Sequence, residues 1–287
     1  MEKICNALTF DVEDYYQVSG FENHIDRSEW KNYESRVKAN TETILSLLED
    51  NNVKATFFVL GMVAERDHSI VKEIFDAGHE IASHGYSHRL IYNQSPEEFR
   101  SETVKSKDLL ESIINEPVCG YRAASYSITN NSLWALDIIH NSGFQYDSSI
   151  FPIYHDRYGI KDFSRRIGPV NYQNTSLDLI EFPITSVKLS GLNIPASGGG
   201  YFRLYPYFIS KILLNNFLIT EKQPFVFYLH PWEFDPEQPR VQGLSWFTRF
   251  RHYNNIHKCS DRLTHLIHDF KFGRIIDILR DMQLLSK

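Results

Sequence analysis

Three carboxylates directly follow the apolar run ICNALTF near the start of the chain: Asp11, Glu13 and Asp14. A solvated acidic turn is one interpretation of this cluster. The other is a site where one carboxylate acts as a base and another binds a metal ion. Acids this close together repel each other unless a cation or an arginine lies among them, which favours the second interpretation. Repulsion by itself does not decide between them: without the other motifs, a solvated turn remains the favoured interpretation of the stretch.

A pair of histidines, His84 and His88, stands in the segment SHGYSH. A spacing of four would place both imidazoles on one face of a helix, close enough to share an ion. In a chain with 12 histidines such a spacing also arises by chance. Two imidazoles and one carboxylate would leave positions open for water and substrate, which a hydrolytic metal centre needs.

Three further polar residues follow apolar runs. Arg122, in YRAASYS, could pair with a carboxylate and hold its pKa down, or form a structural salt bridge. His230 ends the apolar run FVFYL, where partial desolvation suits a general acid, although a satisfied core histidine is the alternative. Asp147, in YDSS, could orient a histidine.

Alternating strands and helices would have to position these residues. The apolar patterns predict strands at 4–10, 53–61, 80–85, 118–128, 144–151, 177–185 and 224–234, and helices at 35–52, 68–79, 95–115, 131–143 and 205–221. Ser95, Pro96 and Glu98 predict a capping box at the start of one helix. This alternation predicts a parallel α/β sheet or barrel, with the chemistry at the carboxyl ends of the strands.

Bulk composition excludes several classes of protein. The 287 residues carry a net charge of −6, which does not favour nucleic acid as a partner. Cys5, Cys119 and Cys259 are odd in number and widely spaced, so we expect reduced thiols. The first residues do not match a signal peptide, and no apolar run reaches transmembrane length. We therefore expect a cytoplasmic protein, with peripheral membrane contact as a further expectation.

Together these segments resemble the polysaccharide deacetylase family, the NodB-homology or carbohydrate esterase 4 group. TFDVED, SHGYSH, YRAASY, YDSS and YLHPW look like its five motifs, in the family's order, from Thr9 to Trp232. FDVEDYYQV, ASGGGYFRLYP and the tail after LHPWEFDPEQPR resemble a subgroup associated with bacterial exopolysaccharide and O-antigen loci.

The resemblance implies an α/β fold, a distorted (β/α) barrel of seven or eight strands. We expect residues 1–287 to form one such domain, with an insertion at about 152–203 and a mainly helical extension at about 235–287. The implied reaction is hydrolysis of an N-acetyl group from an amino sugar.

The resemblance also implies roles for individual residues. Asp11 would be the general base, Arg122 would orient it, and His230 would protonate the leaving amine. His84 and His88 would bind a divalent metal, usually Zn²⁺. Asp147 would tune the catalytic histidine.

The first motif departs from the family pattern, which has two adjacent aspartates, because Val12 takes the second position. The metal carboxylate must then be Glu13 or Asp14. Strand alternation puts Asp11 and Glu13 on one face and Asp14 on the other, but the strand is ending there. Aspartate is shorter and more usual beside two histidines in this family, so we favour Asp14 and keep Glu13 as the alternative.

Candidate substrate-binding residues are Tyr126, Tyr201, Arg203 and Trp232. Tyr201 and Arg203 follow a run of three glycines that permits close backbone approach, although a flexible turn before a helix is an equal interpretation. The segment LSWFTRFRHYNN at 244–255 mixes aromatic residues with arginines. We expect it to pack against the barrel, and a position at a membrane interface is the alternative.

The favoured function is therefore metal-dependent removal of an N-acetyl group in surface polysaccharide biosynthesis, on a cytoplasmic lipid-linked or nucleotide-linked saccharide. One alternative is an allantoinase-like hydrolase of a cyclic amide or imide. Another is a silent glycan-binding protein, which would be expected to lack the base or the acid. Asp11 and His230 are both present and argue against it.

Overall fold

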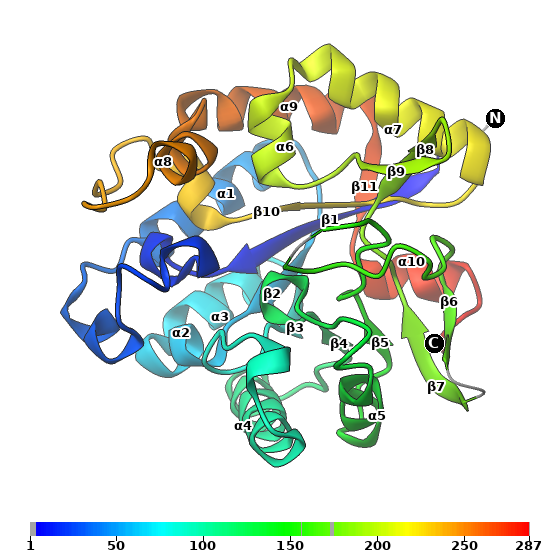
Figure 1. Ribbon diagram of the computed structural model, residues 1–287, viewed down its shortest axis with the longest axis horizontal. Coiled ribbons are helices and arrows are strands. Elements are labelled where there is room, and N and C mark those ends of the chain that lie inside the picture. Colours follow the sequence, from blue (N-terminus) through cyan, green and yellow to red (C-terminus); the bar gives the residue numbers. More distant parts are fainter. Residues whose placement is uncertain (1–3, 156, 173–174, 287) are drawn as a thin grey trace.

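The computed structural model describes residues 4–155, 157–172 and 175–286 of the chain. Across these residues the main sheet is curled and has nine strands in the order β10-β1-β2-β3-β4-β5-β7-β6, with β11 also paired to β1 (Figure 1). All its strand pairs are parallel except β6 with β7. The strands are β1 (Cys5–Val12), β2 (Thr56–Val59), β3 (Glu80–Ser83), β4 (Gly120–Tyr121), β5 (Tyr146–Asp147), β6 (Gly168–Tyr172), β7 (Thr175–Glu181), β10 (Val226–Leu229) and β11 (Lys271–Gly273).

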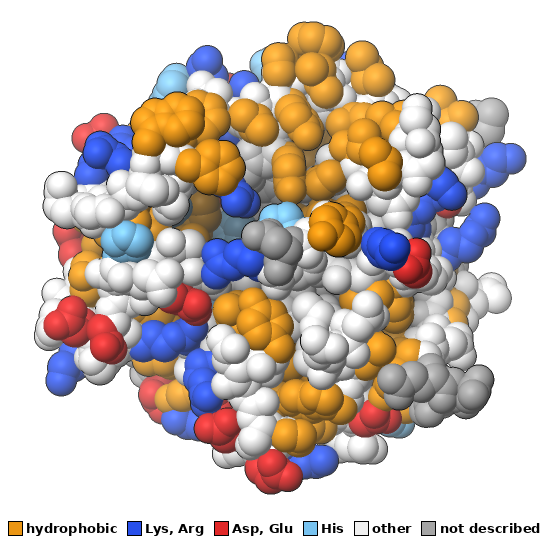
Figure 2. Space-filling view, viewed as in Figure 1, with side chains coloured by type: hydrophobic (Ala, Val, Ile, Leu, Met, Phe, Trp, Pro, Cys, Tyr) orange, Lys and Arg blue, Asp and Glu red, His pale blue; other side chains and the backbone are white. Residues whose placement is uncertain are grey.

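Helices connect the parallel strands, with α2, α3, α4 and α5 below β1 in Figure 1 and α7 and α9 above it. The space-filling view shows hydrophobic side chains gathered over α6, α7 and α8 (Figure 2). Among the described residues, no helix is both long enough and apolar enough to cross a bilayer. The helices are α1 (Val37–Asp50), α2 (Gly61–Arg66), α3 (His68–Asp76), α4 (Pro96–Ile114), α5 (Trp134–Asn141), α6 (Gly199–Leu204), α7 (Tyr207–Glu221), α8 (Trp246–Tyr253), α9 (Cys259–Asp269) and α10 (Ile275–Asp281).

Shorter elements occupy the connections between these helices and strands. The hairpin of β8 (Ser186–Leu189) and β9 (Leu192–Pro195) forms a separate two-stranded sheet. The 3₁₀ helices are η1 (Tyr15–Gln17), η2 (Ser19–Phe21), η3 (Arg27–Asn32), η4 (Ile91–Asn93), η5 (Ala124–Tyr126), η6 (Pro231–Phe234) and η7 (Ile256–Lys258).

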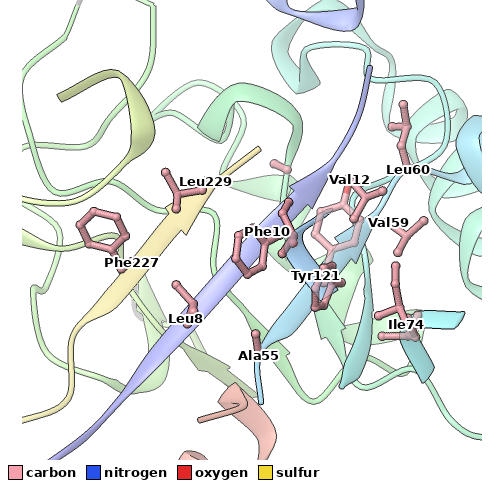
Figure 3. Packing of buried hydrophobic residues seen from close by; sticks show 14 of the residues in the cluster. Leu8, Phe10, Val12, Ala55, Val59, Leu60, Ile74, Tyr121, Phe227 and Leu229 are labelled. Carbon is pink, nitrogen blue, oxygen red and sulfur yellow. The ribbon is translucent and has the colours of Figure 1, made fainter. Parts of the chain in front are cut away.

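Strand β1 separates the main hydrophobic core from the site. Leu8, Phe10 and Val12 belong to the cluster that fills the space between sheet and helices, beside Phe227 and Leu229 of β10 (Figure 3). Because side chains alternate along a strand, Thr9 and Asp11 then point to the other face of the sheet. Burial of the even-numbered side chains therefore fixes where Asp11 can point.

Side-chain hydrogen bonds, instead of a full strand pairing, bridge the two ends of the sheet beside β10. Thr185, a few residues beyond β7, donates its hydroxyl to the Val226 carbonyl at 2.8 Å and accepts from the Val226 N–H at 2.9 Å. It thereby bridges the segment after β7 to β10 across the open side of the sheet.

The expected distorted α/β barrel is confirmed, as is the capping box, in which Ser95 and Glu98 each bond the other's backbone N–H. Strands of the main sheet lie within the expected insertion and within the expected mainly helical extension, and the extension also holds α8, α9 and α10. Strand β7, within the range expected to be an insertion, pairs with β5 in the main sheet. Strand β11, within the expected helical extension, pairs with β1.

Candidate active site

Asp11 lies at the end of β1 and is held by two side chains. The Arg122 guanidinium donates from Nη1 to Asp11 Oδ1 at 2.7 Å, and the Tyr126 hydroxyl donates to Oδ2 at 3.4 Å. Arg122 is fully buried, 3.9 Å from the Phe58 ring centroid. Burial acts to lower the pKa of Arg122, but the charge of Asp11 raises it overall, so the guanidinium stays charged. The expected contact between Arg122 and Asp11 is present.

Glu13, His84 and His88 come together beside Asp11. Their ligand atoms all lie within 4.8 Å of one another, and all three residues are buried. His84 Nδ1 lies 2.9 Å from the Arg122 carbonyl, which fixes this nitrogen as the donor and leaves Nε2 free to bind an ion. Burial lowers the pKa of His84 to about 4, so its imidazole is neutral at neutral pH.

The histidine pair forms in a way that differs from the sequence interpretation. Residues 84–90 are not helical, so helical spacing does not bring the rings together. A turn after β3 does so, with His88 at a φ of +56° and the ring centroids 5.4 Å apart. The pairing was predicted, but its assumed geometry was wrong.

A divalent metal ion fits this cluster. His88 Nε2 lies 2.6 Å from Glu13 Oε2, although within the described residues that oxygen accepts no hydrogen bond. Burial alone would raise the pKa of Glu13, yet the neighbouring histidines, His88 foremost, lower it to about 2. The site therefore holds an ionised carboxylate and at least one neutral imidazole facing each other. Two imidazoles with one carboxylate form a donor set typical of catalytic zinc.

The preference for Asp14 as the metal ligand is corrected by the structure. Its carboxylate accepts from the Ser35 hydroxyl at 2.6 Å and the Arg36 N–H at 3.0 Å, and Asp14 is not a member of the cluster. Alternation along β1 persists to Glu13, so Asp14 points to the opposite face, where it precedes η1.

His230 approaches from the end of β10. Its Nε2 lies 4.0 Å from Asp11 Oδ2 and 3.9 Å from Glu13 Oε1. Its Nδ1 lies 3.0 Å from Glu233 Oε2. Burial would lower the pKa of His230, but the hydrogen bond and charge of Glu233 raise it to about 9. The imidazole is therefore placed and charged to act as a proton donor.

Glu233 was not identified from the sequence, although its spacing of three from His230 was visible there. It is fully buried, and Arg203 Nε donates to its Oε1 at 2.7 Å. Burial alone would raise the pKa of Glu233, but Arg203 and His230 lower it. Gly199 makes room for this carboxylate, because a Cβ there would lie 1.8 Å from Glu233 Oε2.

Asp147 does not take the role expected of it. Its carboxylate binds the hydroxyl and N–H of Ser149, and burial raises its pKa beside Glu181. The contacts described for Asp147 include none with His230. Because Ser149 accepts from the Ala123 N–H at 2.8 Å, Asp147 supports the loop after Arg122.

The candidate substrate residues separate into two groups. Tyr126 contacts Asp11, and Trp232 donates from Nε1 to Glu13 Oε1 at 3.1 Å while stacking on His230. Arg203 is buried and bonds Glu233 and the backbone of α8, so it positions protein groups. Tyr201 is partly buried and packs on Tyr205.

A cavity of about 270 Å³ adjoins His230 and Trp232. Tyr158 and Tyr228 add further aromatic rings to its wall, and Ser125 adds a hydroxyl. A larger hollow of about 560 Å³ lies beside Asp14, but none of His230, Trp232 and Glu233 lines it, whereas all three line the smaller cavity. The smaller cavity is therefore the candidate substrate site.

Two family models match the chain in succession. The model described as "Polysaccharide deacetylase" matches residues 2–146, and a "Domain of unknown function (DUF3473)" matches residues 148–280. A peptidoglycan-N-acetylglucosamine deacetylase of Bacillus cereus is 27% identical over 163 residues, which cover 53% of this chain and 59% of that enzyme. The chain thus spans little more than half the length of this relative.

Solved structures resemble the whole chain. A candidate polysaccharide deacetylase of Mycobacterium smegmatis superposes with a TM-score of 0.63 and 19% identity, covering 100% of this chain and 93% of that one. Puue allantoinase superposes with a TM-score of 0.60 and 14% identity, covering 96% and 89%. At these identities the likeness shows the fold alone.

Proposed function

The chain belongs to the polysaccharide deacetylase family, and on that premise we propose that it is a metal-dependent hydrolase that removes an N-acetyl group from an amino sugar. One observation carries this proposal. Asp11, His230 and the cluster of Glu13, His84 and His88 converge at the carboxyl ends of parallel strands, where such folds place their chemistry.

The proposed reaction needs a base and an acid on either side of the acetyl carbonyl. Asp11, held by Arg122 and Tyr126, accepts a proton from the attacking water. His230, charged and oriented by Glu233, donates a proton to the nitrogen as the C–N bond breaks and acetate leaves. A divalent ion, which we propose to be Zn²⁺, would supply Lewis-acid polarisation of the carbonyl when held by the cluster.

We further propose that the substrate is a lipid-linked or nucleotide-linked precursor of a bacterial surface polysaccharide, in the cytoplasm. The aromatic wall formed by Tyr158, Tyr228 and Trp232 supports a sugar substrate, because aromatic faces pack on sugar rings. The cysteines support a reducing compartment, since all three are free thiols.

The test is acetate release by the zinc-loaded protein from chitooligosaccharides, nucleotide-linked N-acetylhexosamine and lipid-linked N-acetylhexosamine. Asp11→Asn and His230→Ala should each lower the rate by about 10²- to 10⁴-fold at unchanged zinc content. His268→Ala, at an exposed position on α9, is the control and should keep the wild-type rate.

A panel of cyclic ureides, assayed in parallel, tests the allantoinase-like alternative. Opening of a ureide without acetate release from any sugar donor would replace the proposed function. Zinc-loaded protein active on neither class would reject both hydrolase functions.

A further inference from the structure

Two segments of this acidic chain contain no acidic residue. The 287 residues include 36 aspartates and glutamates, yet none lies between Phe182 and Thr220 or between Gln238 and Ser260. The same segments carry seven cationic side chains: Lys188, Arg203, Lys211, Arg240, Arg249, Arg251 and Lys258. A chain with net charge −6 therefore concentrates positive charge in these segments.

The fold brings the two segments together on one face, which we call the acid-free face. The first segment forms the β8–β9 hairpin, α6 and most of α7, and the second forms α8 and η7. Helix α6 packs on α8, and α7 packs on β8. Arg203 of α6 ties the two segments by donating to the carbonyls of His252 and Asn254 at 2.7 and 2.9 Å.

The acid-free face also exposes unusually many large hydrophobic side chains. It holds nine of the thirteen most exposed in the described residues: Leu189, Leu192, Leu204, Phe208, Ile212, Ile219, Trp246, Phe247 and Phe250. Trp246 is 76% exposed and Ile219 is 72% exposed. The segment 244–255 packs against the barrel through Leu244 and His252, as expected, but Trp246, Phe247 and Phe250 face outward.

Helix α7 presents an outer face that a water-exposed helix does not normally have. Phe208, Ile212 and Ile219 are exposed along it, whereas its charged residues Lys211 and Glu221 are engaged by Asp269 and Arg165. A helix on a soluble surface normally turns charged residues outward. Contiguous apolar surface of this kind marks an interaction site.

The acid-free face borders the candidate substrate cavity. Gly200, Phe247 and Arg251 belong to this face and line the cavity that reaches His230. In Figure 2 the hydrophobic side chains over α6, α7 and α8 stand beside a hollow in the surface. Whatever covers this face therefore meets the entrance to the cavity.

We propose that the acid-free face docks on a lipid bilayer that contains anionic lipid. Exposed tryptophan and phenylalanine beside arginine suit the boundary between headgroups and acyl chains. The two segments add no carboxylate that would repel anionic headgroups, and their exposed cations such as Lys188 and Arg249 add attraction. The cavity entrance then faces the membrane, where a lipid-linked sugar would be presented; this last step rests on the proposed function, whereas docking does not.

The test is co-sedimentation with vesicles of phosphatidylcholine alone and of phosphatidylcholine with about one third phosphatidylglycerol. We expect binding to the anionic vesicles that is at least about tenfold tighter and that weakens as salt rises from about 0.05 M to about 0.5 M. Combined Phe208→Ser and Ile212→Ser should weaken it about tenfold or more. Arg249→Glu should weaken it about tenfold at low salt and much less at high salt.

Matched controls lie on α4, on the opposite side of β1 from α7 in Figure 1. Val104→Ser and Arg100→Glu replace exposed residues there and should leave binding within about twofold. Far-ultraviolet circular dichroism melts should match the wild type for every variant, because all replaced side chains are exposed.

Three results would overturn the proposal. One is no binding to anionic vesicles, and another is equal binding to neutral and anionic vesicles. The third is a stable dimer in sedimentation velocity that Phe208→Ser and Ile212→Ser dissociate, which would assign the face to a second copy. Acetate release from water-soluble donors is measured separately, so loss of docking and loss of the deacetylase function are distinguishable.

Discussion

At the residue scale, the site depends on which side chains share one face of β1. Leu8, Phe10 and Val12 are fixed by the core, so Asp11 and Glu13 share the inner face and Asp14 cannot. Whether an acid stands at an odd or an even position along the strand therefore matters more than whether it is an aspartate or a glutamate. Glutamate can serve as the ligand because its position already faces the histidines.

The first prediction compares Glu13→Gln with Asp14→Asn. Glu13→Gln should lower zinc affinity by at least about 100-fold, because the amide loses the charged ligand. Asp14→Asn should keep stoichiometric zinc and lower the free energy of unfolding by about 1–3 kcal/mol, since it weakens the bonds from Ser35 and Arg36. Metal analysis after dialysis and denaturant unfolding measure the two effects. Zinc loss in Asp14→Asn with retention in Glu13→Gln would reverse the assignment.

The second prediction concerns Glu233, which raises the pKa of His230. A general acid must be protonated, so activity falls as pH rises through the pKa of His230. Glu233→Gln removes the negative charge and lowers that pKa, so the alkaline limb of the kcat/KM profile should move to lower pH. The amide oxygen can still accept from Arg203, which preserves the fold.

Glu237→Gln is the matched control for this pH profile. Glu237 is exposed in the turn that follows η6, so its replacement should leave the limb in place. An unshifted limb in Glu233→Gln would show that Glu233 does not set the protonation of His230.

At the element scale, the three-glycine run before α6 has a steric cause. Gly198 has a φ of +101°, and a Cβ there would lie 2.3 Å from Tyr228 side-chain atoms. Gly199 leaves room for the Glu233 carboxylate, whereas a Cβ at Gly200 would meet no atom within 4 Å. The glycines thus differ in purpose: the first two permit packing under the site and the third is unconstrained.

The third prediction follows from that difference. Gly199→Ala should lower the free energy of unfolding by about 1–3 kcal/mol or more and reduce activity, because it displaces Glu233 from His230. Gly200→Ala is the control and should be neutral or stabilise by up to about 1 kcal/mol, since alanine favours the helix. Denaturant unfolding and kcat measure both effects. Equal stability of the two variants would contradict the steric explanation.

An element can be predicted from the sequence when the interactions that form it lie between residues close together in the chain. The capping box of α4 and the buried run of β1 were predictable, because short-range hydrogen bonds and apolar patterns encode them. Strands β4 and β5 have only two residues each, and their positions depend on neighbours in the sheet. The turn that sets His88 at positive φ and the contact of Arg203 with Glu233 arise from tertiary packing, so no local pattern encodes them.

At the scale of the whole molecule, the two family-model matches do not correspond to two structural units. β1, from the first match, lies between β10 on one side and β2 on the other, and its first residues also pair with β11; both β10 and β11 come from the second match. The core in Figure 3 likewise joins Leu8 and Phe10 to Phe227 and Leu229. The site likewise takes residues from both matches, because Asp11 is in the first and His230 is in the second.

The fourth prediction is that residues 1–147 expressed alone will neither fold cooperatively nor retain zinc, although they contain Glu13, His84 and His88. Without β10 one edge of β1 loses its hydrogen-bonded neighbour, and without β11 the first residues of β1 lose their partner on the other edge, so the strand that presents Glu13 is no longer fixed. Thermal melts and metal analysis measure both properties. Co-expression of residues 148–287 is the control and should restore them if the fragments associate. A fragment 1–147 that melts cooperatively with one bound zinc would show that the first half is a domain in its own right.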